Sequence, residues 1–240
     1  MILHTDPQGS EAWLAARRGV ITASRFKDAR DRLKSGQPSK TCLAYAMDVA
    51  RERIPGGTVM AVFQNAAMKM GQTEEPVARM LREAETGELI EEAGFITTDD
   101  RIFGVSVDGL IAPKGVWECK TMVSSATLFT AMVDGDISEY LDQCNGAMWL
   151  LGRDWVDLSL WCPDLQKLHT VRINRDDEAI QRLEDDLMAF ARLVDQYEAK
   201  LRALLAPAAA EPPPWVEATP TVAAPAAPVT TPAALAVPTF

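Results

Sequence analysis

The sequence contains only two histidines, His4 and His169, among 240 residues. A hydrolase that binds its metal through several histidines is therefore excluded by number. The four cysteines are scattered without a CxxC pair, so their spacing predicts neither a zinc cluster nor a disulfide framework. We expect reduced thiols, most of them buried.

Long apolar runs are also missing. No run approaches the roughly 18 residues that a membrane-spanning helix needs. The first ten residues, MILHTDPQGS, lack the apolar core of a signal peptide. We therefore expect a soluble, cytoplasmic protein with no membrane partner.

Basic residues are fewer than acidic ones, 24 against 34, and the formal net charge is −10. Taken alone, this charge argues against a nucleic-acid partner. Its distribution weakens the objection, because ten basic and four acidic residues lie in 17–53, whereas four basic and eight acidic residues lie in 176–202. One face of the protein could therefore be basic. Solvated helix faces would explain the same counts without DNA.

Charge nearly disappears from Ala206 to Phe240, where alanine and proline dominate. Such a segment can form neither a packed core nor a regular helix, and we expect a disordered tail over 206–240. Residues 1–205 are enough for one domain with a substantial hydrophobic core. Trp215 and the apolar end LAVPTF are unusual in a pure linker, so the tail is a candidate docking segment for a partner protein.

The order of the expected elements predicts a mixed α/β domain, with a central mixed sheet flanked by helices. The predicted helices cover 11–18, 22–33, 41–53, 73–86, 124–132, 138–151 and 176–205, and the predicted strands cover 88–98, 103–122, 155–162 and 167–173. The strand over 155–162 alternates apolar and polar residues, so we expect it to be half-buried.

Several helix boundaries follow from local signals. Thr22 or Ser24 is expected to cap the second helix, and Ser138 the sixth. Pro76 is tolerable in a first helical turn, so the fourth helix is expected to begin near Thr73. Its apolar stripe would be formed by Val77, Met80, Leu81 and Ala84.

The stretch FGVSVDGLIAPKGVWECKTM, from Phe103 to Met122, contains the main candidate residues for metal binding and catalysis. Side chains two apart in a strand share a face, so Glu118 and Lys120 lie side by side. Asp108 supplies a second carboxylate if the chain folds back beside Glu118. Carboxylates that hold a hard divalent cation, with a lysine near the attacking water, suit metal-assisted phosphodiester hydrolysis. A solvated salt bridge on a surface hairpin is the alternative for so short a pattern.

Two further groups could serve such a site. Arg17 could form a phosphate-binding site together with the hydroxyl of Thr22 or Ser24 at the start of the second helix. Both hydroxyls could instead be ordinary helix caps. Glu74 and Glu75 fall in an expected first helical turn, where acids are favoured. One of them is expected to be a helix-start charge, and the other could point into the metal site.

Several separate blocks occur together in a fixed order. They are Trp13, Arg17 and GVITAS (19–24), MGQTEEPVAR (70–79), SVDG (106–109), ECK (118–120), and YLDQ (140–143) followed by Met148-Trp149. With these blocks the chain resembles, over about residues 13–163, the lambda-exonuclease or YqaJ-type viral recombinase nucleases of the PD-(D/E)xK superfamily. Val107 replaces the signature proline before the aspartate, which affects backbone shape rather than Asp108.

The resemblance implies a restriction-endonuclease-like α/β core and a Mg²⁺-dependent exonuclease, with Mn²⁺ as a substitute for Mg²⁺. Such an enzyme degrades one strand of duplex DNA from its 5′ end and leaves 3′ overhangs for phage-type recombination by strand annealing. The resemblance also implies a ring-shaped homotrimer around the DNA. A phage-encoded member would work in the cytoplasm of its bacterial host.

Position by position, the resemblance implies Asp108, Glu118 and the backbone carbonyl of Cys119 as metal ligands, and Glu75 for a second metal. Lys120 would orient the attacking water and stabilise charge on the phosphate. Gln143 would help to position the nucleophile or the DNA. The candidate residues for DNA and its 5′-phosphate are Arg17, Thr22, Ser24, Arg25, Ser124 and Ser125.

Two other interpretations remain open at this point. A non-catalytic module that binds DNA ends would lack a metal carboxylate or the lysine, whereas Asp108, Glu118 and Lys120 are all present. An endonuclease of restriction or repair type would use the same core. The expected partners are double-stranded DNA ends and, for the tail, a single-strand annealing protein or a single-strand-binding protein.

Overall fold

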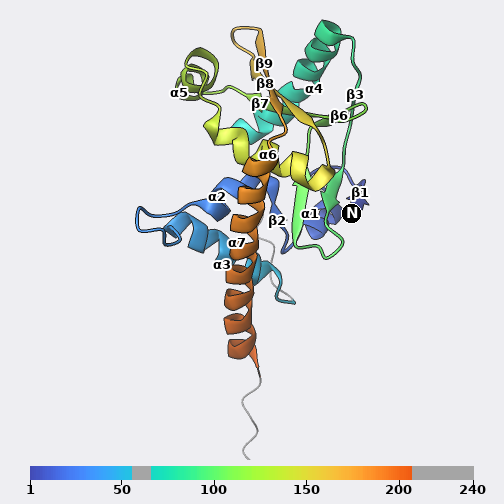
Figure 1. Ribbon diagram of the computed structural model, residues 1–240. Coiled ribbons are helices and arrows are strands. Elements are labelled where there is room, and N and C mark those ends of the chain that lie inside the picture. The colour runs from blue at the N-terminus through green and yellow to red at the C-terminus, as the bar shows by residue number, and fades with distance from the viewer. Residues whose placement is uncertain (56–65, 207–240) are drawn as a thin grey trace, which may run out of the picture. The chain divides into compact units, whose positions relative to one another are not determined.

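The computed structural model describes residues 1–55 and 66–206 (Figure 1). Residues 207–240 of the expected disordered tail lie outside the described residues, and so do Trp215 and the docking role predicted for it. Met1–Leu205 forms one compact unit. Within the described ranges, no helix is both long and apolar enough to cross a membrane.

Helices and strands follow each other in a mixed order. The helices are α1 (Glu11–Arg17), the 3₁₀ turn η1 (Ala23–Arg25), α2 (Phe26–Arg30), α3 (Lys40–Glu52), α4 (Ala66–Thr86), α5 (Ser125–Leu128), the π-helical turn η2 (Phe129–Val133), α6 (Ser138–Leu151) and α7 (Asp177–Leu205). The strands are β1 (Ile2–His4), β2 (Ile21–Thr22), β3 (Ile90–Glu91), β4 (Phe95–Thr97), β5 (Phe103–Ser106), β6 (Gly109–Ile111), β7 (Gly115–Thr121), β8 (Trp155–Cys162) and β9 (Lys167–Asn174).

Two mixed sheets carry the fold. One has the order β1-β4-β5-β2 and the other has the order β3-β6-β7-β8-β9. In the larger sheet, β6 pairs antiparallel with β7, whereas β7 pairs parallel with β8. The chain between β7 and β8 contains α5 and α6, so the crossover brings α6 back onto the sheet. This architecture confirms the predicted mixed α/β fold.

Strand β7 separates two hydrophobic clusters. Val116 belongs to the main core, which includes Ala147 and Met148 of α6. Trp117 belongs to a smaller cluster with Ala78 of α4 and Trp161 of β8. Since neighbouring side chains in a strand point to opposite faces, α6 covers one face of β7 and α4 covers the other.

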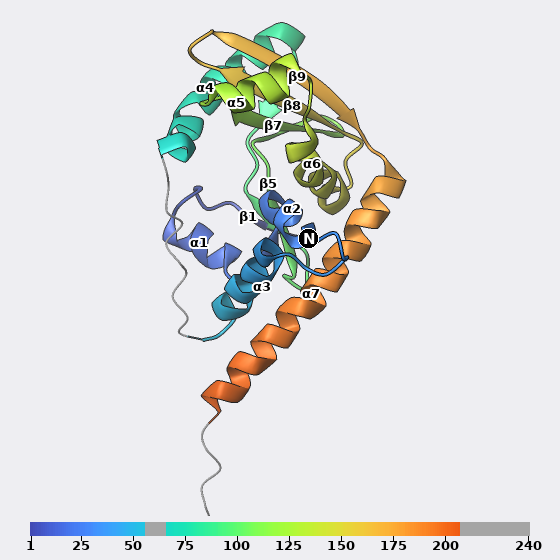
Figure 2. The same cartoon turned by 90° about the vertical axis from the view of Figure 1, so that its left-hand side faces the viewer.

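The long helix α7 runs beside α3 in both views (Figures 1 and 2). Ion pairs link the basic N-terminal region to the acidic helices. Arg30 pairs with Asp142 of α6 at 2.5 Å and with Asp186 of α7 at 2.8 Å. Arg53 pairs with Asp195 of α7 at 3.0 Å. Part of the charge polarity predicted from the sequence is therefore neutralised inside the domain.

The predicted start of α4 is wrong, because the helix begins at Ala66 and contains Pro76 in its interior. Strong helix formers before Thr73, in the run AAMKMGQ, extend the helix upstream and outweigh the backbone hydrogen bond that the proline removes. The predicted apolar stripe is also wrong. Val77 and Met80 are exposed, whereas Ala78 is fully buried against the sheet.

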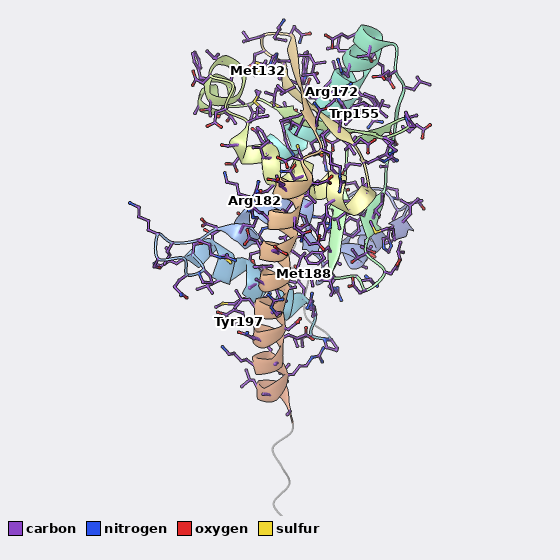
Figure 3. All side chains as sticks on the ribbon, in the orientation of Figure 1. Met132, Trp155, Arg172, Arg182, Met188 and Tyr197 are labelled. Atoms are coloured by element: carbon purple, nitrogen blue, oxygen red, sulfur yellow. The ribbon has the colours of Figure 1, made fainter. Side chains whose placement is uncertain are left out.

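Strand β8 is buried on both faces rather than half-buried. The polar residues that suggested a solvent face have partners inside the protein. Ser159 accepts a hydrogen bond from Nε1 of Trp117 at 2.9 Å. Asp157 pairs with Arg82 of α4 and with Arg172 of β9, at 2.5 Å and 2.7 Å. Arg172 also lies over the ring of Trp155, 3.7 Å from its centroid (Figure 3).

Local residues define the ends of two long helices. Asp176 caps α7 through the N–H groups of Glu178 and Ala179, and Gly152 ends α6 in a left-handed conformation. The predicted caps at Thr22 and Ser138 are wrong. Thr22 lies in strand β2 and makes no capping bond, and the N–H of Ser138 itself bonds to Asp136. The short strands β1 and β2 were not predicted.

Candidate active site

The β6–β7 pairing brings Asp108 beside Glu118. Gly109 is opposite Trp117 in the antiparallel register, so Asp108 lies next to the following residue of β7. Oδ2 of Asp108 accepts a hydrogen bond from the backbone N–H of Cys119 at 2.7 Å. The β6–β7 hairpin, which turns at 112–114, therefore folds back beside Glu118 as the sequence predicts.

Glu118, Lys120 and Gln143 form a connected polar group. Nζ of Lys120 donates to Oε1 of Glu118 at 2.7 Å and to Oε1 of Gln143 at 3.0 Å. Nε2 of Gln143 donates to the same Glu118 oxygen at 2.5 Å. Glu118 and Lys120 alternate with Trp117 and so face α6, which carries Gln143.

Glu75 approaches from the opposite face of the sheet, on α4. Nη2 of Arg79 bonds to the Glu75 carboxylate at 2.8 Å and to the backbone oxygen of Asp108 at 2.9 Å. Glu74, the adjacent acid, instead accepts a hydrogen bond from Nε1 of Trp161 at 3.0 Å. Of the two acids considered from the sequence, Glu75 is the one that lies near Asp108.

The three carboxylates repel one another in a poorly solvated place. Burial, and then the nearby Asp108, raise the pKa of Glu118 to about 7. The same two causes raise the pKa of Glu75 to about 7. Burial also raises the pKa of Asp108. Burial disfavours the charged form of Lys120, but Glu118 and Asp108 outweigh it, so the pKa of Lys120 is raised and the ammonium keeps its charge.

These residues fit a hard divalent cation. Oxygen ligands suit Mg²⁺, and burial raises the pKa values of both Asp108 and Glu118, so a cation bound between them would stabilise their charged forms. In the part of the chain that is described, no three His, Cys, Asp or Glu side chains form a complete metal cage. Mg²⁺ does not need one, because it usually keeps several waters and binds through one or two carboxylates.

The predicted phosphate-binding residues lie on a neighbouring part of the fold. Strand β2, which ends at Thr22, pairs parallel with β5, the strand that leads to Asp108. Turn η1 packs on α6 at Gly146, where an added Cβ would lie 2.5 Å from Phe26 and 3.5 Å from Ala23. Gly146 is one helical turn from Gln143, so the Thr22–Arg25 segment adjoins the helix of the polar group.

The individual candidates differ in their surroundings. Arg17 is half-buried, and Ser24 is exposed. Arg25 is engaged with acids, 2.9 Å from Asp28 and 3.6 Å from Asp48. Ser124 and Ser125 are exposed after β7, and Ser124 caps α5 through the N–H of Thr127.

Sequence reasoning missed two residues that hold these groups in place. Arg79 stood within a recognised block but received no role, and its spacing of four from Glu75 was the available signal. Tyr45 lies inside α3, where nothing in the sequence distinguished it from an ordinary core residue. Its hydroxyl accepts a hydrogen bond from the N–H of Thr22 at 2.9 Å.

A cavity of about 790 Å³ adjoins the carboxylate cluster. Its wall includes Glu75, Arg79 and Asp108, together with the N-terminal segment and residues 91–94. The cluster is therefore accessible from one side of the sheet, although Glu118 itself is only 3% exposed.

Comparisons with known proteins agree with this architecture. The model of the YqaJ-like viral recombinase domain matches residues 12–154. The crystal structure of an alkaline exonuclease from Laribacter hongkongensis shares 33% identity and covers 82% of this chain and 100% of its own, with a TM-score of 0.69. The structure of that exonuclease in complex with dAMP gives 32% identity over the same shares, with a TM-score of 0.70.

A phage-related exonuclease from Haemophilus somnus 129PT has a TM-score of 0.61 at 16% identity, covering 78% of this chain and 96% of its own. This match supports the fold alone. No curated protein matches the sequence significantly.

The fold and these matches define an exonuclease-like protein with a mixed α/β core. The chain belongs to the family of YqaJ-like viral recombinase domains, as the sequence blocks predict.

Proposed function

We propose that the protein is a metal-dependent exonuclease that degrades one strand of duplex DNA from its 5′ end and leaves 3′ overhangs for phage-type recombination by strand annealing. The observation that carries the proposal is the convergence of Asp108, which lies just before β6, with Glu118 and Lys120 on β7. Homology to exonucleases supports the reaction class.

Asp108, Glu118 and the carbonyl of Cys119 are the proposed ligands of Mg²⁺ or Mn²⁺, with Glu75 available for a second ion. A bound ion of this kind polarises the phosphate and makes water a better nucleophile. Lys120 keeps its proton and is placed to donate a hydrogen bond to the attacking water or to a phosphate oxygen. Gln143 holds Lys120 and Glu118 together through its two amide atoms.

Mg²⁺-dependent digestion of two duplex substrates tests the function. A linear duplex labelled at its 5′ ends should lose label as mononucleotides, while a covalently closed circle of the same sequence should stay intact. Digestion of the circle would instead identify an endonuclease on the same core. Binding of linear ends without any digestion would identify a non-catalytic module.

We further propose a homotrimer that encloses DNA, on the strength of the family alone. Light scattering coupled to size-exclusion chromatography should give three times the chain mass, and a monomer would contradict this assembly. For the tail we propose a single-strand annealing or single-strand-binding partner, and pull-down unchanged by deletion of residues 207–240 would refute that role.

A further inference from the structure

Among the described residues, no carboxylate forms an ion pair with the guanidinium of Arg17. Its guanidinium lies over two aromatic rings, 4.5 Å from the centroid of Trp13 and 5.2 Å from that of Phe95. It makes no ion pair with any residue in 1–55 or 66–206. Glu52, the acid whose charge acts on Arg17, already accepts a hydrogen bond from the N–H of Gly19 at 3.0 Å.

Among the described residues, the charge of the Arg17 guanidinium is not balanced by a paired carboxylate. Burial lowers the pKa of Arg17, with Tyr45 and Glu52 offsetting part of the effect, yet a guanidinium remains charged in any protein. A partly desolvated cation without a counter-charge is unfavourable, so the surroundings of Arg17 suit an anionic ligand.

Tyr45 ties the hydroxyl-bearing turn to this region. Its side chain is only 3% exposed, and its oxygen accepts the N–H of Thr22 at 2.9 Å. Two side chains pack against the Tyr45 ring. The guanidinium of Arg25 lies 3.9 Å from its centroid, and the ring of Phe190 on α7 stacks at 5.1 Å.

The Tyr45 hydroxyl remains neutral and keeps its proton. Burial raises the pKa of Tyr45, and hydrogen bonding from Thr22 and the charges of Arg25 and Arg17 offset only part of this effect. Arg17 and Tyr45 are close enough for each to shift the pKa of the other. Thr22, which bonds to the Tyr45 hydroxyl, lies two residues before Ser24.

We propose that Tyr45 is a positioning residue for a terminal phosphate monoester: its hydroxyl holds the Thr22–Ser24 turn beside Arg17, so that the turn and the guanidinium together receive the anion. The inference deepens the proposed function, since it names the residue that makes the site prefer a 5′-phosphoryl end over a 5′-hydroxyl end. Arg25, which is neutralised by two aspartates, packs on Tyr45 rather than serving as the free cation.

The test is binding of short blunt duplexes, with 5′-phosphoryl or 5′-hydroxyl ends, measured by fluorescence anisotropy in EDTA so that no hydrolysis occurs. The wild-type protein should bind the phosphorylated duplex more tightly. Tyr45→Phe keeps the packed ring and leaves the Thr22 N–H without its hydrogen-bond partner, which loosens the Thr22–Ser24 turn. The preference for phosphate should therefore fall about tenfold.

Tyr197→Phe is the matched control, because Tyr197 lies on α7 beside Lys200 and far along the helix from the sheets (Figure 3). It should leave the preference unchanged. An unchanged preference in Tyr45→Phe would overturn the inference, as would equal wild-type affinity for both ends or an equal loss of affinity for both. The binding assay does not require catalysis. A protein that shows the Tyr45-dependent preference but digests no DNA would therefore refute the proposed exonuclease function and leave the role of Tyr45 standing.

Discussion

Nη2 of Arg79 on α4 lies 2.9 Å from the backbone oxygen of Asp108, and the same nitrogen holds the Glu75 carboxylate at 2.8 Å. One guanidinium therefore connects the helix that carries Glu75 to the turn that carries Asp108. Its Nη1 also bonds to Glu92 at 3.1 Å, whereas its buried Nε has no partner among the described residues.

Arg79→Lys should weaken Mg²⁺-dependent digestion by roughly 10–100-fold, because a single ammonium cannot bridge both groups and residues that orient metal ligands typically contribute this much. The apparent Mg²⁺ requirement, measured by titrating the ion at saturating DNA, should rise as well. Arg182→Lys on the exposed side of α7 provides the control (Figure 3). Equal activity of both variants would show that Arg79 does not position the acids.

Lys120→Ala should lower the rate of digestion by at least about 100-fold, since it removes a charged donor placed for the reacting phosphate. Lys114→Ala removes an exposed lysine that pairs with Asp154 at 3.1 Å, and it should have wild-type activity. Single-turnover digestion separates this effect from weaker DNA binding. Full activity in Lys120→Ala would refute the proposed catalytic role.

The ion pairs of Asp157 with Arg82 and Arg172 predict how the free energy of unfolding depends on pH. Burial alone would raise the pKa of Asp157, but hydrogen bonds from Arg172 and Arg82 more than offset it, and its pKa is lowered. A carboxylate whose pKa is lower in the folded than in the unfolded state stabilises the protein at pH values above its unfolded-state pKa. This stabilisation is lost as the pH falls through the folded-state pKa. The contribution is therefore expected at neutral pH and should fade below about pH 4.

Asp157→Asn should accordingly lower the free energy of unfolding by roughly 3–5 kcal/mol at pH 7, because it leaves two arginines beside a neutral group. Urea unfolding from pH 7 to pH 3 measures the difference. The gap between the variant and the wild type should narrow at the acidic end. Asp164→Asn, in the exposed β8–β9 turn, is the control, and a gap independent of pH would contradict the assignment.

Gly19 has a φ of +70°, and a Cβ there would lie 2.6 Å from Cγ of Arg53. Gly19→Ala should therefore combine a backbone penalty of about 1–2 kcal/mol with a clash. Gly9 has a similar φ of +85° with open space around it, so Gly9→Ala isolates the backbone part. Calorimetric melting should show the larger loss for Gly19→Ala, and equal losses would mean that Arg53 moves aside freely.

The hairpin chemistry was predictable because it depends on local rules. Alternation along β7 places Glu118 and Lys120 on one face, and the turn between β6 and β7 brings Asp108 beside Glu118. The opposite side of the site was not predictable in the same way. Glu75 and Arg79 reach Asp108 only through packing of α4 on the sheet, and the Val77 and Met80 spacing pointed to the wrong face of that helix.

Burial of polar residues caused the other errors. Asp157 and Ser159 look like solvent-facing positions until their partners on α4, β7 and β9 are known. Tyr45 was likewise hidden, because its partner Thr22 is 23 residues away in the sequence. Contacts of this kind depend on the tertiary arrangement and leave no periodic pattern.

The ion pairs of Arg30 and Arg53 with the acidic residues of α6 and α7 bear on the ionic-strength response of DNA binding. A cation that already has a carboxylate partner releases few counterions from a DNA backbone. The log–log slope of affinity against salt for one protomer should therefore be shallower than the ten basic residues in 17–53 suggest. For the proposed exonuclease we therefore expect weak long-range attraction to DNA, so that contacts at the strand end determine where it binds.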